Sequence, residues 1–117
     1  MELSTLESEI LIDIHDADMF PQMPFEIENY TLIEKEPKKK IQELAFYLKK
    51  LRRLGLIRYE ENEVFAKGGS RSTKYNNNNV TSICGDKIHI DSKGLKLVER
   101  YNYDKAETQK KIIYLAK

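Results

Sequence analysis

The chain has little that would cross-link it or place it in a membrane. Its 117 residues include one cysteine, Cys84, so no disulfide can form within the chain. No apolar run approaches the roughly 18 residues that a membrane-spanning helix needs. The opening residues MELSTLESE lack the positive start and the apolar stretch of a secretory signal. We therefore expect one soluble domain, residues 1–117, in a reducing cytoplasmic setting and without a membrane partner.

Residue patterns typical of enzymes and metal sites are also missing. The chain has no phosphate-binding glycine loop, no paired-carboxylate motif and no zinc-ligand spacing. His15 and His89 lack nearby ligands, so they are expected to be surface or hydrogen-bonded histidines. Cys84 and His89 could in principle act as nucleophile and base, but they are offset along the chain and no third group orients them. We expect a binding protein, with no catalytic residue, cofactor or metal.

Positive charge is absent from the first third of the chain and abundant after it. Residues 1–34 contain nine carboxylates and no Lys or Arg, whereas residues 35–58 contain nine basic residues and two acidic ones. The net charge of +1 therefore hides a strong separation of charge along the chain. Such a separation favours a highly charged partner, nucleic acid above all, but does not indicate a fold.

The first 34 residues predict one helix and one undecided segment. Ser4 and Glu7 have the spacing of a capping box, which marks the start of a helix. Apolar residues at helical spacing follow, namely Leu6, Ile10, Leu11 and Ile14. The prolines in DMFPQMPF end this helix. Residues 25–34 are too few to separate a short strand from one or two helical turns.

Residues 37–54 form the clearest predicted helix, PKKKIQELAFYLKKLRRL. Pro37 suits its first position, and Gly55 suits the position after its end. One side carries an apolar stripe for the core: Ile41, Leu44, Ala45, Leu48 and Leu51. The opposite arc is expected to face solvent: Lys39, Gln42, Glu43, Phe46, Lys50 and Arg53. An arc this basic is typical of a solvated surface or of a nucleic-acid contact, and both interpretations remain open.

The second half predicts short strands followed by two helices. LIRYE reads as a strand, with EVFAK as its continuation or as a second strand, and residues 67–79 read as a flexible loop. Residues 80–91 predict a β-hairpin that turns at Gly85-Asp86 and places Ile83 opposite Ile88. Thr81 would then face Ile90. Helices are expected over residues 93–101, where Gly94 would allow close packing, and over residues 105–117.

Two stretches of the chain carry a family resemblance. In the first, the basic helix ends in LRRLGLI and runs directly into a strand. The second, KIHIDSKGLKLVE, is similar to a sequence motif of the form ITxxGxxLLE, in which a strand leads into a helix. Together they resemble the winged-helix superfamily, in particular small MarR-type bacterial and phage regulators, over roughly residues 6–100. The resemblance implies an α+β winged helix-turn-helix with three or more helices, a small antiparallel β-wing and a C-terminal helix.

The resemblance also implies a transcriptional regulator with duplex DNA as its partner. Residues 37–54 would be the recognition helix in the major groove, and residues 67–79 would be the wing. Base contacts would come from Lys38, Lys39, Gln42 and Glu43. Phosphate contacts would come from Lys50, Arg53, Lys67, Arg71 and Lys74. The sequence identifies neither the DNA target nor a small-molecule effector.

An alternative interpretation keeps the winged-helix fold without DNA binding. Phe46 would be an apolar ring at the centre of the basic arc, which is unusual for a helix that reads a groove. The expected helix within residues 103–117 also presents apolar side chains that need a partner surface, namely Ile112, Ile113 and Leu115. These features indicate either that the DNA-binding protein is a homodimer formed through its terminal helices or, in the alternative, a protein-interaction module of bacterial or phage origin.

Overall fold

The computed structural model shows an α+β protein and describes residues 2–20, 22, 25, 30–76 and 78–102. Its elements in chain order are α1 (Thr5–Met19), α2 (Pro37–Arg53), β1 (Ile57–Arg58), α3 (Glu61–Val64), β2 (Phe65–Ser72), β3 (Asn78–Ile83) and β4 (His89–Ile90). Short 3-10 turns occupy Thr73–Tyr75 and Gly85–Lys87, and residues 92–102 are helical. Within these residues, no helix combines the length and apolar character needed to cross a membrane.

The capping box predicted for α1 is confirmed. The Ser4 hydroxyl accepts a hydrogen bond from the Glu7 amide at 3.1 Å, and the Glu7 carboxylate accepts one from the Ser4 amide at 3.0 Å. Ile10, Leu11 and Ile14 are buried in the core, as their spacing predicts. The capping box fixes where the helix begins, and the apolar spacing fixes which side faces inward.

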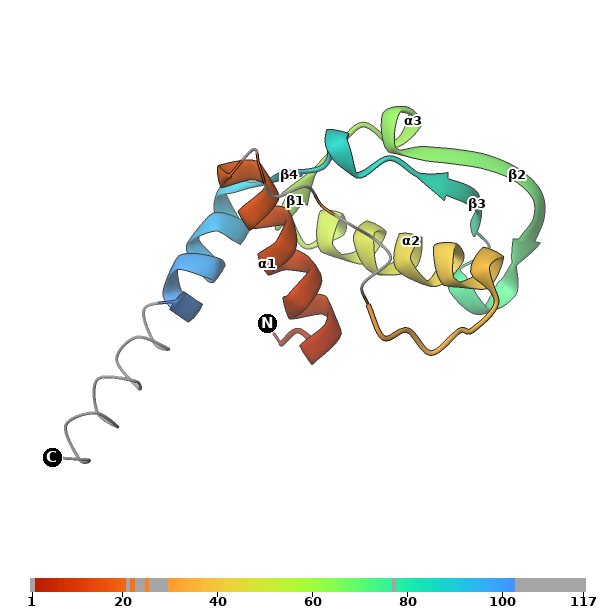
Figure 1. Ribbon diagram of the computed structural model, residues 1–117, viewed down its shortest axis with the longest axis horizontal. Helices are drawn as coiled ribbons and strands as arrows, with labels where there is room; N and C mark the ends of the chain where they lie inside the picture. The colour runs from red at the N-terminus through yellow and green to blue at the C-terminus, as the bar shows by residue number, and fades with distance from the viewer. Residues whose placement is uncertain (1, 21, 23–24, 26–29, 77, 103–117) are drawn as a thin grey trace, which may run out of the picture.

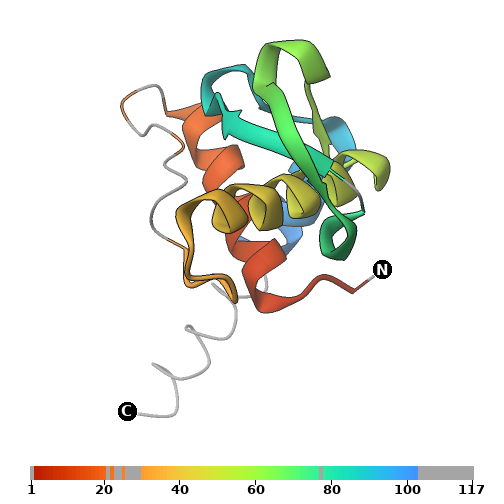
Figure 2. The ribbon, with the colours of Figure 1, turned by 90° about the vertical axis from the view of Figure 1, so that its right-hand side faces the viewer.

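The predicted basic helix is confirmed as α2. It begins with Pro37 at its first position, and Gly55 after its end has a φ of 77°, a conformation that favours glycine. Four residues of the predicted stripe are buried and Ile41 is half-buried. One side of α2 packs beneath the hairpin of β2 and β3, and another side packs against α1 (Figures 1 and 2).

The strands pair differently from the prediction. β2 pairs antiparallel with β3, with Phe65 opposite Ile83, whereas β1 pairs antiparallel with β4, with Ile57 opposite Ile90. The predicted hairpin within residues 80–91 is therefore wrong, because the 3-10 turn Gly85–Lys87 leads the chain from one two-stranded sheet to the other. The β2–β3 hairpin extends from residue 65 to residue 83, so the flexible loop predicted for residues 67–79 is wrong over most of its length: β2 continues to Ser72, a 3-10 turn follows, and β3 begins at Asn78.

The segment before α2 contains no helix or strand where the structure describes it. Residues 30–36 are irregular, and Leu32 within them is buried against the rest of the protein. Residues 26–29 lie outside the described part of the chain. Of the two predictions for residues 25–34, neither a strand nor a helical turn is present in residues 30–34.

The helix of residues 92–102 packs closely against the turn between α2 and β1, as predicted for Gly94. The Asp91 carboxylate accepts a hydrogen bond from the Ser92 amide at 2.8 Å where this helix begins. A Cβ atom on Gly94 would collide with the carbonyl oxygen of Leu56. Glycine therefore permits the close approach. The predicted C-terminal helix lies outside the described residues, together with Ile112, Ile113 and Leu115.

Candidate nucleic-acid interface

The β2–β3 hairpin runs back along α2, so its tip meets the start of that helix (Figure 1). The buried side chain of Asn78 donates hydrogen bonds from Nδ2 to the carbonyl oxygens of Gln42, at 3.1 Å, and Tyr75, at 2.9 Å. The ring of Tyr75 lies 6.1 Å from the ring of Phe46, centroid to centroid. These contacts hold the hairpin tip against the first half of α2.

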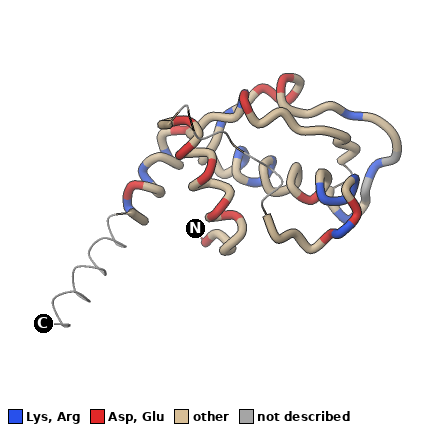
Figure 3. Tube along the Cα trace, in the orientation of Figure 1, with Lys and Arg blue, Asp and Glu red and all other residues tan. Residues whose placement is uncertain are grey.

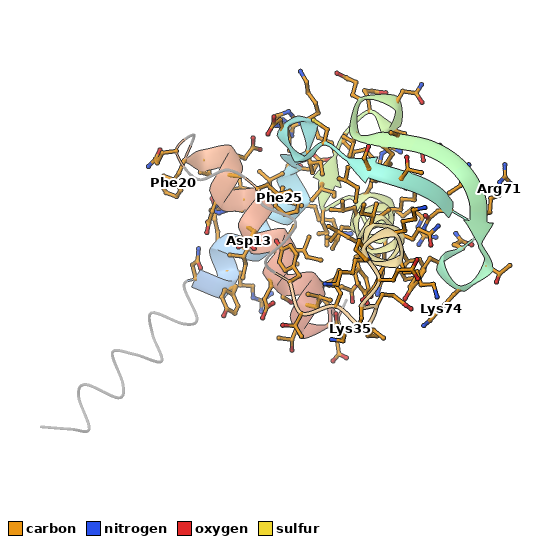
Figure 4. The ribbon with its side chains drawn as sticks, turned by 45° about the vertical axis from the view of Figure 1, so that its right-hand side comes forward. Asp13, Phe20, Phe25, Lys35, Arg71 and Lys74 are labelled. Carbon is orange, nitrogen blue, oxygen red and sulfur yellow. The ribbon has the colours of Figure 1, made fainter. Side chains whose placement is uncertain are left out.

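Six exposed basic residues lie at this end of the molecule, and we call them the cationic end: Lys35, Lys38, Lys39, Lys40, Arg71 and Lys74. Figure 3 shows this concentration of Lys and Arg where α2 begins and the hairpin turns. In Figure 4, Arg71 and Lys74 lie on the side of the view away from Asp13 and Phe20, and Lys35 lies lower, between Asp13 and Lys74. Segments that are distant in sequence thus contribute to one positive surface.

Two carboxylates partly offset this charge. Glu34 pairs with Lys74 at 3.2 Å, and Glu36 pairs with Lys39 at 3.8 Å. The first turn of α2 has no acidic residue, and the side chain of Glu36 does not cap it. The partial positive charge of the helix N-terminus therefore adds to that of the lysines.

Glu43, predicted to contact bases, is instead completely buried. Its two carboxylate oxygens accept hydrogen bonds from the Ile33 amide at 3.2 Å, the Glu34 amide at 2.8 Å and the Tyr47 hydroxyl at 3.0 Å. Burial and the bond to Glu43 raise the pKa of Tyr47 to about 12, so its hydroxyl stays a donor. Residues 30–36 cover Glu43, and it cannot reach a nucleic acid.

Phe46 is also less exposed than predicted. It is half-buried and packs edge-on against the Tyr47 ring, with a centroid distance of 5.8 Å, as well as against Tyr75. Gln42 is likewise half-buried beside Asn78. The expectation that the middle of the arc faces solvent is therefore wrong, because the hairpin folds over it.

Lys50 forms an ion pair with Glu7, with 2.7 Å between Nζ and Oε2. The side chain of Glu7 is 5% exposed, and burial by itself would raise its pKa. Hydrogen bonds with Lys50 and Ser4 together outweigh that effect and hold the pKa of Glu7 below its ordinary value. Lys50 thus links α2 to α1, which its position in the sequence did not reveal.

Of the remaining predicted phosphate contacts, Arg71 and Lys74 lie at the cationic end, whereas Lys67 and Arg53 lie elsewhere. Lys67 pairs with Glu61 at 3.4 Å, and Glu61 also pairs with Lys49 at 3.3 Å. Arg53 is exposed but lies at the other end of α2, about 20 Å from Lys39 at ~1.5 Å of helix rise per residue. Of the nine predicted residues, Lys38, Lys39, Arg71 and Lys74 come together at the cationic end.

The structure adds Lys35 and Lys40 to the predicted site. Both belong to the basic run around Pro37, and that run was the available signal. The two histidines are hydrogen-bonded, as predicted: His15 contacts Asp16 at 3.0 Å, and His89 contacts Asp18 at 2.9 Å. In the described part of the chain, no three His, Cys, Asp or Glu side chains are grouped to hold a metal ion.

Comparisons of the chain with protein-family models, with curated proteins and with solved structures find no match.

Proposed function

We propose that the protein is a winged-helix-type DNA-binding protein, acting as a transcriptional regulator, and that it contacts the phosphates of duplex DNA through the cationic end. The observation that carries this proposal is the return of the hairpin along α2. It holds Lys74 beside Glu34, just before the first turn of α2, and brings Arg71 to the same end of the molecule. In this arrangement, α2 is the recognition helix and the β2–β3 hairpin is the wing.

The physical basis is the release of counterions from DNA. Each Lys or Arg that neutralises a phosphate releases condensed cations, which favours binding at low salt. α1 carries acidic residues and no Lys or Arg, so it would be repelled by the same phosphates. The charge separation would therefore turn the cationic end toward DNA during approach.

The buried positions limit how α2 can read a sequence. Glu43 is fully buried and Phe46 lies under the hairpin, so the middle of α2 is not available to a groove. Base contacts would come from the first turn, where Lys38 and Lys39 are exposed. Phosphate contacts carry no sequence information, so we expect affinity to depend weakly on sequence.

The test is the affinity for a random-sequence duplex of about two helical turns, measured by fluorescence anisotropy at low salt. Lys38→Gln and Arg71→Gln should each weaken binding several-fold, because each removes a cation from the interface. Lys96→Gln, an exposed change on the helix of residues 92–102, is the matched control and should leave binding unchanged. Equal effects of all three changes, or no binding by the wild type, would contradict the proposal.

Exposed apolar residues at the end of α1 favour a second candidate, the protein-interaction module. Met19 is 45% exposed and Phe20 is 47% exposed, next to each other in the chain. Neighbouring apolar side chains in solvent are typical of a protein contact. If this candidate is right, Phe20→Asp should abolish capture of a partner protein. A Phe20→Asp variant that captures the same proteins as the wild type and keeps its DNA affinity would contradict this candidate.

A further inference from the structure

A polar concavity of about 630 Å³ lies at the other end of α2 from the cationic end. Its walls come from the last turn of α2, from β1 and the residues after it, and from the 3-10 turn Gly85–Lys87. Three exposed basic residues line it: Arg52, Arg58 and Lys87. The concavity is therefore separate from the proposed DNA-binding surface.

These three cations have no acidic partner to neutralise them among the residues that the structure describes. In the described residues, no carboxylate lies within ion-pair distance of Arg52, Arg58 or Lys87, whereas Lys49 and Lys50 both have acidic partners. Arg58 donates a hydrogen bond from Nη1 to the carbonyl oxygen of Ile90 at 2.6 Å. That bond holds the guanidinium beside the concavity and leaves its other donors free to bind an anion.

Tyr59 supplies the second, independent observation. It lines the same concavity and is only 6% exposed, yet its buried hydroxyl has no hydrogen-bond acceptor among the described residues, and the Arg52 guanidinium beside it can only donate. Burial raises the pKa of Tyr59 to about 12, against the opposing effect of Arg52, whose guanidinium lies 4.8 Å from the ring centroid. A buried donor without an acceptor is unfavourable. The hydroxyl is enclosed, so a ligand oxygen would satisfy it after the exposed Arg52 side chain over the ring moves aside.

Carboxylates on the remaining wall restrict the ligand further. Glu60, Glu63 and Asp91 also line the concavity, and they would repel a molecule that is purely anionic. They would accept hydrogen bonds from hydroxyl or amino groups. A ligand that suits both walls therefore has an anionic group at one end and hydrogen-bond donors at the other.

We propose that this concavity binds a small phosphorylated molecule that carries hydroxyl or amino groups, such as a sugar phosphate or a nucleoside monophosphate. A phosphate monoester has three terminal oxygens and nearly two negative charges at neutral pH. It can therefore accept hydrogen bonds from two arginines, a lysine and the Tyr59 hydroxyl together, whereas a carboxylate has two oxygens. The site is independent of the proposed DNA contact.

The experiment is calorimetric titration of the full chain with AMP and with ribose 5-phosphate, using ribose as the neutral control. Tyr59→Phe removes only the hydroxyl, and should weaken AMP binding about tenfold without lowering the melting temperature. Arg52→Gln should weaken it at least as much. Tyr75→Phe is the matched control, because the Tyr75 hydroxyl, at the hairpin tip, is likewise buried without a partner among the described residues, and AMP binding should be unchanged.

DNA phosphates have the same chemistry, so each variant is also titrated with the random-sequence duplex. A loss of AMP affinity with unchanged duplex affinity supports the proposal. Absence of saturable binding of AMP and ribose 5-phosphate would overturn it, as would AMP binding that Tyr59→Phe and Arg52→Gln leave unchanged. A loss of duplex affinity alone would also overturn it by assigning the site to DNA. None of these results depends on Lys38→Gln, which tests the cationic end.

Discussion

Glu43 illustrates how one residue can decide the character of a surface. A carboxylate is normally removed from water only when several donors replace its hydration. Here two backbone amides and the Tyr47 hydroxyl provide them. The same bonds attach residues 33 and 34 to α2, close to the lysines of the cationic end. Glu43 is therefore a structural anchor behind the proposed interface, not a part of it.

This role predicts a stability effect. Glu43→Gln replaces one acceptor oxygen with an NH₂ group that faces donors, so it should lower the free energy of unfolding by about 2 kcal/mol. Glu36→Gln, which changes an exposed carboxylate, should alter it by less than about 0.5 kcal/mol. Urea denaturation of both variants measures the difference. Equal stability of the two would show that the buried bonds at Glu43 contribute little.

Residue roles that depend on near neighbours could be predicted, and those that depend on distant segments could not. The bonds between Ser4 and Glu7 arise within one helical turn, so their spacing was sufficient. Glu43 has one partner in the next helical turn, Tyr47, but its two backbone partners lie nine and ten positions away in the sequence, and the partner of Lys50 lies 43 positions away. Helical periodicity contains no information about what covers the outer side of a helix.

At the scale of elements, the helices followed from the sequence more closely than the strands. α2 has a proline at its start, a glycine after its end and one apolar stripe, and all of these are local signals. Around Ile83 and Ile90, apolar and polar residues alternate as they do in a hairpin. This alternation shows that the segments are strands but does not show which strand each one pairs with. Phe65 and Ile57 are the actual partners, and only the folded chain shows this choice.

The attachment of the hairpin tip to α2 predicts the effect of Asn78→Ala. This change removes the bonds to the carbonyl oxygens of Gln42 and Tyr75 and the bond from the Val80 amide to Oδ1. Amide hydrogen exchange in residues 73–80 should become faster, and duplex affinity should fall because Arg71 and Lys74 are no longer held beside α2. The neighbouring change Asn79→Ala is the control. Unchanged exchange after Asn78→Ala would contradict the anchoring role.

At the scale of the whole molecule, ion pairs between elements make stability depend on pH. For Glu7, Asp18 and Glu61, burial would raise the pKa, but hydrogen bonds and nearby positive groups outweigh it and lower the pKa of each. Their stabilising contribution is therefore complete above the pKa of the unfolded chain, near 4 to 4.5. It is lost as pH falls through the lower pKa of the folded chain.

This linkage predicts acid destabilisation that is sensitive to Glu7. The wild type should lose stability progressively below about pH 5. Glu7→Gln should be less stable at pH 7 and should show a shallower loss on acidification, because one of the titrating groups has been removed. Urea denaturation between pH 7 and pH 3 measures both curves. Parallel curves for the two proteins would mean that the Glu7 and Lys50 pair does not contribute to the pH dependence.

The most direct test of the DNA-binding proposal is the salt dependence of wild-type binding to a random-sequence duplex. If the cationic end contacts phosphates, the logarithm of the binding constant should fall linearly with the logarithm of salt concentration. The slope should become about one unit shallower in Lys38→Gln or Arg71→Gln, since each loses one phosphate contact. A binding constant that does not change with salt, or the same slope in every variant, would contradict the proposal.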